Sequence, residues 1–166
     1  FNDADYRTKG NFIKWNPSIK TIEDQNALWD ALISDKIDVI ATDHAPHTFD
    51  EKNQLYVDCP SGGPLVQHSL YIMYEHFLEK RISLEKIVEK MCHNPAILFN
   101  IKKRGFIREG FFADLVILRK NQSWVINKNN ILYKCGWSPF EGKKINSMIT
   151  HTFVSGNLAY ENGVFN

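Results

Sequence analysis

An aspartate and two histidines stand close together in this chain, at Asp43, His44 and His47. A carboxylate can act as an oxygen ligand for a metal ion or as a general base, and an imidazole can hold or transfer a proton near neutral pH. Pro46 lies inside the group, so no regular helix or strand is expected to run through it. An ordinary polar turn is the alternative interpretation, because short Asp/His clusters are common in loops.

The segment before this cluster must hold it in place. Residues 39–42 (Val-Ile-Ala-Thr) form a short run typical of the fully buried strands of parallel sheets. Residues 21–35 begin with the capping pattern Thr-x-x-Asp and continue with helical apolar spacing, which predicts an amphipathic helix. A helix that leads into a buried strand is half of a βαβ unit, and (β/α) barrels carry their active sites where such strands end. The sequence therefore predicts an α/β fold with Asp43 at a catalytic edge.

Composition and charge narrow the class of protein. The chain has 166 residues, 43% hydrophobic and 23% charged, with a net charge of +1, as in soluble globular proteins. It has no basic patch for nucleic acid and no apolar run of the roughly 18 residues that a membrane span needs. Three widely spaced cysteines indicate reduced thiols in a cytoplasmic protein and argue against a disulfide framework. A whole (β/α)₈ barrel takes about 250 residues, so a chain that begins with Phe1 is expected to be the C-terminal part of a longer protein.

Two further segments have features of a binding site. Residues 1–13 predict a loop whose end merges into a short strand at 12–15, and Pro17 favours an extended Asn16 with a fixed amide direction. Residues 48–60 are polar and irregular, as in a mobile lid. Gly62 and Gly63 would let the backbone approach a ligand closely, because no Cβ intervenes. The alternatives are an asparagine that starts a turn and a glycine turn that leads into a helix.

The remaining elements predict a scaffold. Helices are expected at 65–80 and after the capping residue Ser83, and 134–143 is expected to be a loop. His68, His76 and His151 are interpreted as packing, surface or structural histidines, and Cys92-His93 as no metal pair. From Gly105 the pattern changes to short strands between turns, which are expected at residues 105–110, 115–118, 124–126, 150–154 and 157–160.

Six motifs together resemble the C-terminal part of dihydroorotases, and they extend over nearly the whole chain. They are Lys14-Trp15-Asn16-Pro17, Thr42-Asp43-His44-Ala45-Pro46-His47, Ser61-Gly62-Gly63-Pro64, Asn94-Pro95-Ala96, Gly110-Phe111-Phe112-Ala113-Asp114-Leu115-Val116 and Ser138-Pro139-Phe140-Glu141-Gly142. The second motif is the specific one, whereas the fifth is shared with amidohydrolases in general. The chain departs from the usual pattern at Ser18 and Lys20, where a second proline and an arginine are more common. Hydantoinases and allantoinases are the nearest relatives of this family.

The resemblance implies a fold and a set of site residues. Residues 1–104 would be the C-terminal portion of a (β/α)₈ TIM-like metal-dependent hydrolase barrel, and residues 105–166 the C-terminal strands of a small composite β-sandwich. Asp43 would be both a zinc ligand and the catalytic proton shuttle. Asn16, His47 and the backbone of Gly62 and Gly63 would bind the substrate. His44 would orient the carboxylate or the metal ligands, although the roles of the two histidines could be exchanged.

The resemblance also implies partners. Two Zn²⁺ ions are expected in a complete site, whose His-x-His pair, carboxylated lysine, two further histidines and substrate-binding arginine must precede Phe1. The chain alone is therefore expected to be inactive and to need the N-terminal part of the same protein. The substrate would be dihydroorotate or N-carbamoyl-aspartate, and a homodimer is a possible assembly. A hydantoinase or allantoinase, or a non-catalytic dihydroorotase-like subunit, are the alternatives.

Overall fold

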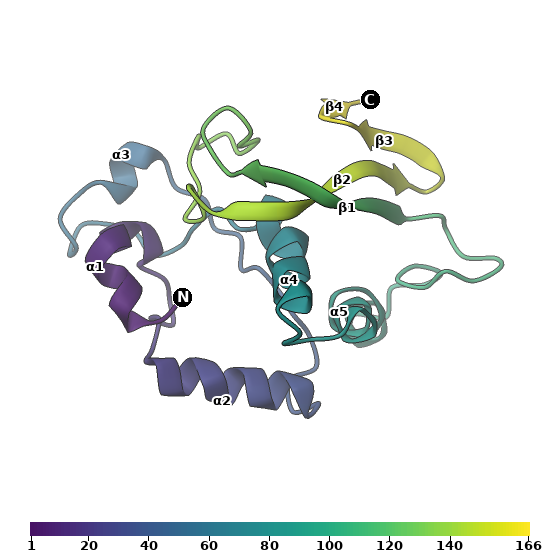
Figure 1. Cartoon of the computed structure of the whole chain (residues 1–166), viewed down its shortest axis with the longest axis horizontal. Coiled ribbons are helices and arrows are strands. Elements are labelled where there is room, and N and C mark those ends of the chain that lie inside the picture. Colours follow the sequence, from purple (N-terminus) through teal and green to yellow (C-terminus); the bar gives the residue numbers. More distant parts are fainter. The chain divides into compact units, whose positions relative to one another are not determined.

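The computed structural model describes all of residues 1–166 (Figure 1). The chain divides into two units that are interleaved in sequence. Unit 1 contains Phe1–Ile37, Ala41–Leu70 and Val125–Lys143, and unit 2 contains Asp38–Ile40, Tyr71–Trp124 and Lys144–Asn166. All the residues expected to form a site lie in unit 1. The domain division at residue 105 stays a prediction for the whole protein.

Unit 1 consists of one 12-residue helix and several helical turns, joined by loops. Its elements are η1 (Asp3–Asp5), α1 (Tyr6–Lys9), η2 (Gly10–Ile13), α2 (Ile22–Ile33), α3 (Phe49–Lys52) and η3 (Val66–His68). The helix expected at 21–35 is confirmed as α2. It begins as predicted, because the Asp24 carboxylate accepts a hydrogen bond from the Thr21 N–H (3.1 Å) and the Thr21 hydroxyl accepts one from the Asp24 N–H (3.4 Å).

The expected loop at 1–13 and the expected strand at 12–15 are both wrong, since the segment folds into helical turns. Lys14 N–H donates to the carbonyl of Asn11, and Ile13 is fully buried at the end of η2. A strand forms only where a neighbouring strand accepts its hydrogen bonds, and residues 12–15 have no such neighbour in this chain. The apolar residues are instead buried by a local turn.

The expected buried strand at 39–42 is also absent. Ile40 N–H donates to the carbonyl of Lys90, within unit 2, and Ala41 is exposed. The one ladder contact comes later, where His44 and Gly63 form an isolated parallel bridge and Ala45 N–H donates to the Gly63 carbonyl at 3.2 Å. No strand of this chain pairs with 39–42, so the apolar run forms no ladder.

Unit 2 contains further helices and a sheet. The helix expected at 65–80 is η3 followed by α4 (Ser69–Leu78), whose first two residues belong to unit 1. The helix after Ser83 is confirmed as α5 (Leu84–Val88), and the Ser83 hydroxyl accepts a hydrogen bond from the Lys86 N–H. A π-helical turn η4 (Glu89–His93) and α6 (Asn94–Leu98) follow it. None of the helices is both long and apolar enough to span a lipid bilayer.

The sheet has four strands in the order β1-β2-β3-β4, with bounds Leu115–Val125, Lys144–Val154, Asn157–Glu161 and Val164–Phe165. The pairs β2/β3 and β3/β4 are antiparallel. The strands expected at 115–118, 150–154 and 157–160 are confirmed, and the one expected at 124–126 is the end of β1. The strand expected at 105–110 is wrong, because Gly105 and Gly110 both have positive φ and form turns.

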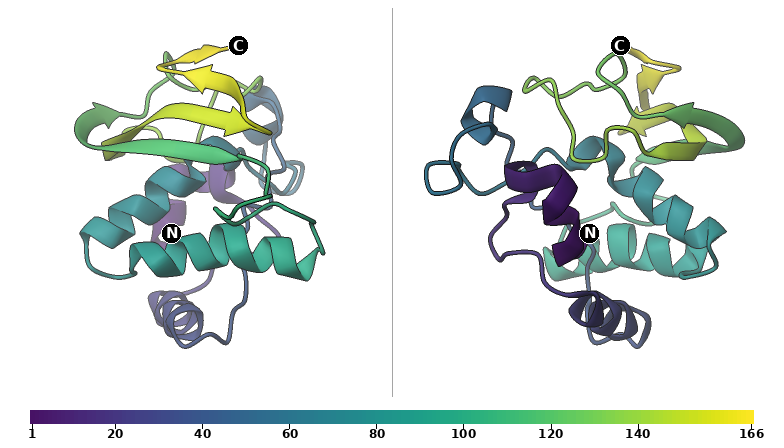
Figure 2. Two further views of the ribbon diagram at one scale, coloured as in Figure 1. Left: turned by 90° about the vertical axis from the view of Figure 1, so that its right-hand side faces the viewer. Right: turned by 60° about the vertical axis from the view of Figure 1, so that its left-hand side comes forward.

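Helix α4 runs along this sheet (Figure 2). The buried carboxylate of Glu75 accepts hydrogen bonds from the backbone and side-chain N–H groups of Asn146, and the Tyr71 hydroxyl accepts one from the Ile149 N–H. A polar side chain thus fixes the helix against β2 at both points. A second layer of strands, as in a sandwich, stays a prediction.

Candidate active site

Asp43 lies in a left-handed turn and its side chain is available. Its φ is +45°, a region that Asp and Asn adopt more readily than other side chains. The residue is exposed, and its carboxylate takes part in no hydrogen bond or ion pair within the chain. The turn therefore presents an unengaged carboxylate, which can accept a proton or bind a cation.

His44 is held by the backbone that follows the glycine pair. Its Nδ1 accepts hydrogen bonds from the N–H groups of Leu65 (3.0 Å) and Val66 (3.4 Å), and its ring lies 5.3 Å from that of Tyr133. Because Nδ1 is the acceptor, the ring proton of the neutral imidazole sits on Nε2. His44 can therefore donate through Nε2 alone.

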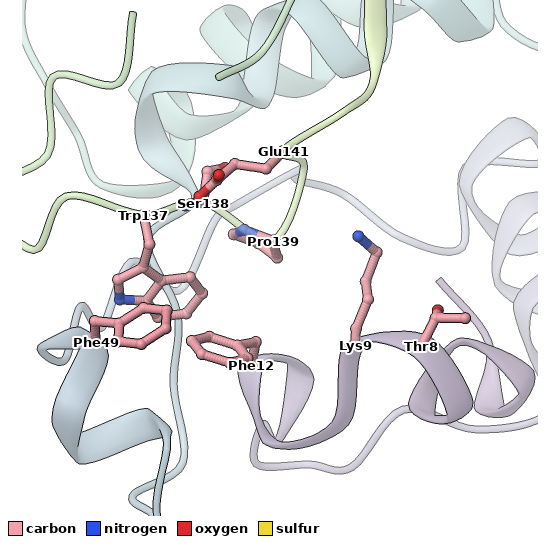
Figure 3. A pocket seen from close by; sticks show the side chains of 8 residues that line it. All are labelled: Thr8, Lys9, Phe12, Phe49, Trp137, Ser138, Pro139 and Glu141. Carbon is pink, nitrogen blue, oxygen red and sulfur yellow. Dashed lines mark hydrogen bonds between the residues drawn. The ribbon is translucent and has the colours of Figure 1, made fainter. Parts of the chain in front are cut away.

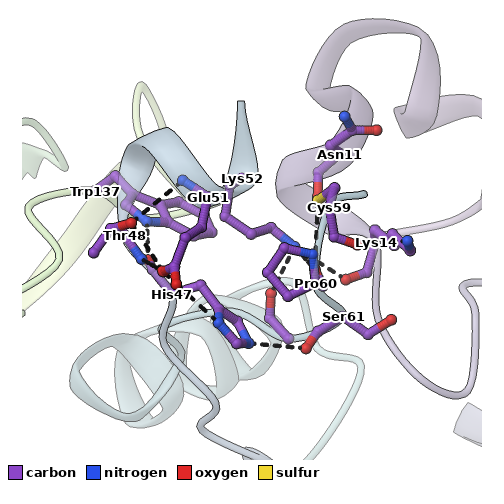
Figure 4. Close-up of polar contacts among 11 residues, drawn as sticks. Asn11, Lys14, His47, Thr48, Glu51, Lys52, Cys59, Pro60, Ser61 and Trp137 are labelled. Atoms are coloured by element: carbon purple, nitrogen blue, oxygen red, sulfur yellow. Dashed lines mark hydrogen bonds and ion pairs between the residues drawn. The ribbon is translucent and has the colours of Figure 1, made fainter. Parts of the chain in front are cut away.

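His47 is directed by contacts at both ring nitrogens (Figure 4). Nε2 lies 3.1 Å from the Ser61 carbonyl oxygen and must donate to it, and Nδ1 lies 4.0 Å from a carboxylate oxygen of Glu51. Hydrogen bonds from the Thr48 backbone and hydroxyl lower the pKa of Glu51 and fix that carboxylate. His47 thus links the turn after Asp43 to the loop that carries the glycines.

Gly62 and Gly63 allow this loop to pack closely. A Cβ on Gly62, whose φ is +131°, would lie 2.6 Å from the Ala45 carbonyl oxygen, and one on Gly63 would lie 2.8 Å from the Trp15 indole nitrogen. Side chains are excluded at both positions, because these distances are far below van der Waals contact. In this structure the two glycines thus let the loop pack closely against Ala45 and Trp15. Their contact with a ligand stays a prediction.

Asn16 lies next to the same loop. Gly62 N–H donates to the carbonyl of Lys14 at 3.0 Å, which ties the segment before Asn16 to the glycine pair. Asn16 is exposed, its amide makes no hydrogen bond within the chain, and its peptide bond to Pro17 is cis. The structure thus brings together the segments that carry Asn16, Asp43, His44, His47, Gly62 and Gly63.

Two residues that contact this site were not expected from the sequence. Trp137, which is 2% exposed, donates from its indole N–H to the carbonyl of His47 (2.8 Å). Lys52 is fully buried beside the glycine loop. Each stands in a segment whose polar composition predicts a surface loop, so no sequence signal separates it from its neighbours.

A cavity of about 200 Å³ lies beside Trp137, and three of its eight lining residues are aromatic (Figure 3). Its lining residues are Thr8, Lys9, Phe12, Phe49, Trp137, Ser138, Pro139 and Glu141. None of the expected site residues lines it. This cavity is therefore separate from the candidate active site.

His68 packs in the interior of unit 1, as expected. It is fully buried, and its Nδ1 lies 3.2 Å from the Ser138 hydroxyl and 3.3 Å from the Tyr133 hydroxyl. Burial lowers the pKa of His68 to about 4 and raises the pKa of Tyr133 to about 12. Both rings are therefore neutral at pH 7 and serve packing.

The chain does not form a metal centre by its own residues. Nowhere do three His, Cys, Asp or Glu side chains gather in a way that could hold a metal ion. Catalytic zinc sites use at least three protein ligands. Asp43 can thus contribute at most one ligand to such a site.

Comparison with known proteins gives consistent matches. A model of the amidohydrolase family matches residues 16–159. Dihydroorotases of Endomicrobium trichonymphae and Pyrococcus furiosus are 36% and 34% identical, over 89% and 95% of this chain and 35% and 36% of their own length. The structure of L-hydantoinase (dihydropyrimidinase) from Arthrobacter aurescens is similar at a TM-score of 0.92 with 28% identity, over 100% of this chain and 38% of that protein. The chain thus spans little more than a third of the length of these relatives.

Proposed function

This chain belongs to the amidohydrolase family, and we propose on that basis that it forms part of a dihydroorotase. The observation that carries the proposal is the exposed, unengaged carboxylate of Asp43 beside the anchored His44 and His47. Support comes from relatives named dihydroorotase that are 34–36% identical over about nine tenths of the chain. Their identity is higher than the 28% shared with the L-hydantoinase structure.

The proposed reaction interconverts (S)-dihydroorotate and N-carbamoyl-L-aspartate, a step of pyrimidine synthesis in the cytoplasm. In the hydrolytic direction, water attacks the ring amide carbon and the bond from that carbon to the ring nitrogen breaks. Asp43 accepts the proton of the attacking water and delivers it to the departing nitrogen, so atoms and charge balance. The same carboxylate serves the reverse reaction, because microscopic reversibility requires it.

Substrate binding is assigned to three groups around this carboxylate. The free amide of Asn16 and the backbone of Gly62 and Gly63 would hydrogen-bond the substrate ring. His47 already donates through Nε2 to the Ser61 carbonyl. It would therefore contact the substrate from a ring whose Nε2 holds the glycine loop and whose Nδ1 lies 4.0 Å from the Glu51 carboxylate. His44 would orient the turn through its anchored ring.

Zinc is proposed as the cofactor, two ions per complete site, but this chain alone does not fit it. Asp43 supplies one carboxylate, and the described residues offer no further cluster of ligands. We therefore assign the remaining ligands to the N-terminal part of the same protein, and we derive no catalytic step through the metal. The assembly of the complete enzyme as a homodimer belongs to the same proposal.

A hydantoinase or allantoinase is the alternative, and the similarity to the L-hydantoinase structure supports its first member at a lower identity than the dihydroorotases have. Purified full-length protein should be assayed with dihydroorotate, hydantoin and allantoin under the same conditions. We expect kcat/KM to be highest with dihydroorotate, by tenfold or more. A preference for hydantoin or allantoin would contradict the proposed substrate, and inactivity with all three would indicate a non-catalytic subunit.

A further inference from the structure

Lys52 is a fully buried ammonium group that contacts only oxygen atoms of the backbone in its hydrogen bonds. It ends helix α3, whose first turn is fixed by the reciprocal hydrogen bonds of Thr48 and Glu51. Its Nζ donates to the carbonyls of Pro60 (2.9 Å), Gly62 (2.9 Å) and Lys14 (3.2 Å) (Figure 4). An ammonium has three N–H donors, so these three carbonyls satisfy it completely.

A buried charge of this kind is costly unless hydrogen bonds compensate it. No carboxylate forms an ion pair with Lys52, and burial lowers its pKa, an effect that the neighbouring Cys59 thiol partly opposes. An apolar side chain could fill the same space without that cost. The position of the ammonium is therefore better explained by the carbonyls that it gathers than by core packing.

The three carbonyls belong to the segments that carry the expected substrate-binding groups. Lys14 stands two residues before Asn16, and its carbonyl also accepts the Gly62 N–H at 3.0 Å. Pro60 and Gly62 flank Ser61, whose carbonyl accepts the hydrogen bond of His47. One ammonium thus joins the Asn16 segment to the glycine loop at the point where His47 also anchors that loop.

We propose that Lys52 is a positioning residue for substrate binding, which holds the loop 60–63 against the segment 14–16 so that both can face one substrate ring. Removal of the ammonium takes one donor from each of the three carbonyls, and only the Lys14 carbonyl keeps a backbone donor, the Gly62 N–H. The loop must move for the Pro60 and Gly62 carbonyls to find water. The hydrogen bonds of Lys52 go to Lys14, Pro60 and Gly62, and none goes to Asp43. Its loss should therefore weaken substrate binding more than the chemical step.

The experiment uses full-length protein with Lys52→Met, which keeps the length of the side chain and removes its donors. This kinetic readout rests on the proposed function. We expect KM for dihydroorotate to rise about tenfold, which corresponds to about 1.4 kcal/mol, while kcat stays within about threefold. Lys36→Met is the matched control, because Lys36 is an exposed lysine of the same unit, and it should leave both constants unchanged. Unchanged KM in folded Lys52→Met would overturn the proposal, as would a loss confined to kcat.

A second variant and a second measurement keep the test valid if Lys52→Met does not fold or if the parent protein is inactive. Lys52→Gln keeps two N–H donors without the charge, so it should raise KM less than a folded Lys52→Met does. If Lys52→Met does not fold, Lys52→Gln supplies the kinetic test by itself, and its KM should still exceed the parental value. Amide hydrogen exchange of a peptide containing Gly62 and Gly63 should be faster in either variant than in the parent, with exchange of α2 unchanged. This readout needs no turnover, so it tests Lys52 even if the parent protein does not hydrolyse dihydroorotate. Parental exchange in this peptide would contradict the positioning role.

Discussion

The indole N–H of Trp137 donates a 2.8 Å hydrogen bond to the backbone carbonyl of His47, although the two residues are 90 positions apart. The loop that carries Trp137 therefore supports the segment that carries the candidate catalytic residues. Trp137 contacts the backbone carbonyl of His47 and not its imidazole. The hydrogen bond therefore fixes the path of the backbone at His47 and does not act on the ring directly.

Trp137→Phe should lower the free energy of unfolding of unit 1 by about 1 kcal/mol beyond the loss of ring contacts, because the partly buried His47 carbonyl loses its donor. Denaturant unfolding of the full-length protein, monitored by a probe in unit 1, measures this. Trp15→Phe is the matched control, since the Trp15 indole nitrogen is buried without a hydrogen-bond partner and its removal costs no hydrogen bond. Equal destabilisation by the two substitutions would show that the hydrogen bond to His47 contributes nothing.

Asp43→Asn should leave the fold intact and reduce kcat by about 10²–10⁴-fold, because the amide cannot accept the proton of the attacking water. Asparagine is the right replacement here, since it adopts the positive φ of this turn as readily as aspartate does. Steady-state kinetics and circular dichroism of the full-length variant check both parts. A kcat near that of the parent would rule out the proton-shuttle role.

His47→Ala should raise KM for dihydroorotate strongly while the metal content of the full-length protein stays at the parental value. Two effects add: the proposed contact with substrate is lost, and the Ser61 carbonyl loses its donor. Elemental analysis beside the kinetics separates binding from metal ligation. Loss of one metal ion per protein would show that His47 is a ligand instead.

Local signals in the sequence predicted the elements that depend on local contacts. Thr21 and Ser83 start their helices through hydrogen bonds to residues three positions away. Short sequence motifs predict such contacts. The strands predicted at 115–118 and 157–160 from their composition do form, because their partner strands lie in the same chain. The strands expected at 12–15 and 39–42 had the right composition but no partner in the chain, and composition cannot report that.

In the candidate site, too, only some of the residues could be predicted from the sequence. The motif with Asp43, His44 and His47 could be identified because its residue types are those that chemistry requires. Lys52 and Trp137 could not, because their roles come from carbonyl groups of residues distant in sequence, and a backbone carbonyl has no sequence signature. The supporting contacts of a loop are set by its tertiary path.

Residues 1–166 expressed alone should bind no zinc tightly and should not hydrolyse dihydroorotate. A catalytic zinc site needs at least three protein ligands, and no three His, Cys, Asp or Glu side chains of this chain gather in that way. The carboxylate of Asp43 alone is not sufficient. Exposed apolar side chains such as Leu28, Ile97 and Phe99 should also favour aggregation. Zinc titration, light scattering and an activity assay test this expectation. A soluble, zinc-loaded and active product would contradict the assignment of ligands to the N-terminal part.

Acidification should destabilise unit 1 through His68. Its pKa is about 4 in the folded protein because the ring is buried, and it returns to about 6.5 on unfolding. Between these values the unfolded chain binds a proton that the folded chain does not, so the free energy of unfolding falls as the pH is lowered from about 6.5 to about 4. The full difference amounts to about 3 kcal/mol. Ser138 and Tyr133, which contact Nδ1, are neutral and give the imidazolium no compensating charge.

His68→Gln should therefore flatten the pH dependence of denaturant unfolding by up to one proton in this range. His93→Gln, which changes a histidine stacked on Phe106 in unit 2, is the control and should keep the parental slope for unit 1. An unchanged slope in folded His68→Gln would show that burial of His68 does not control the acid stability.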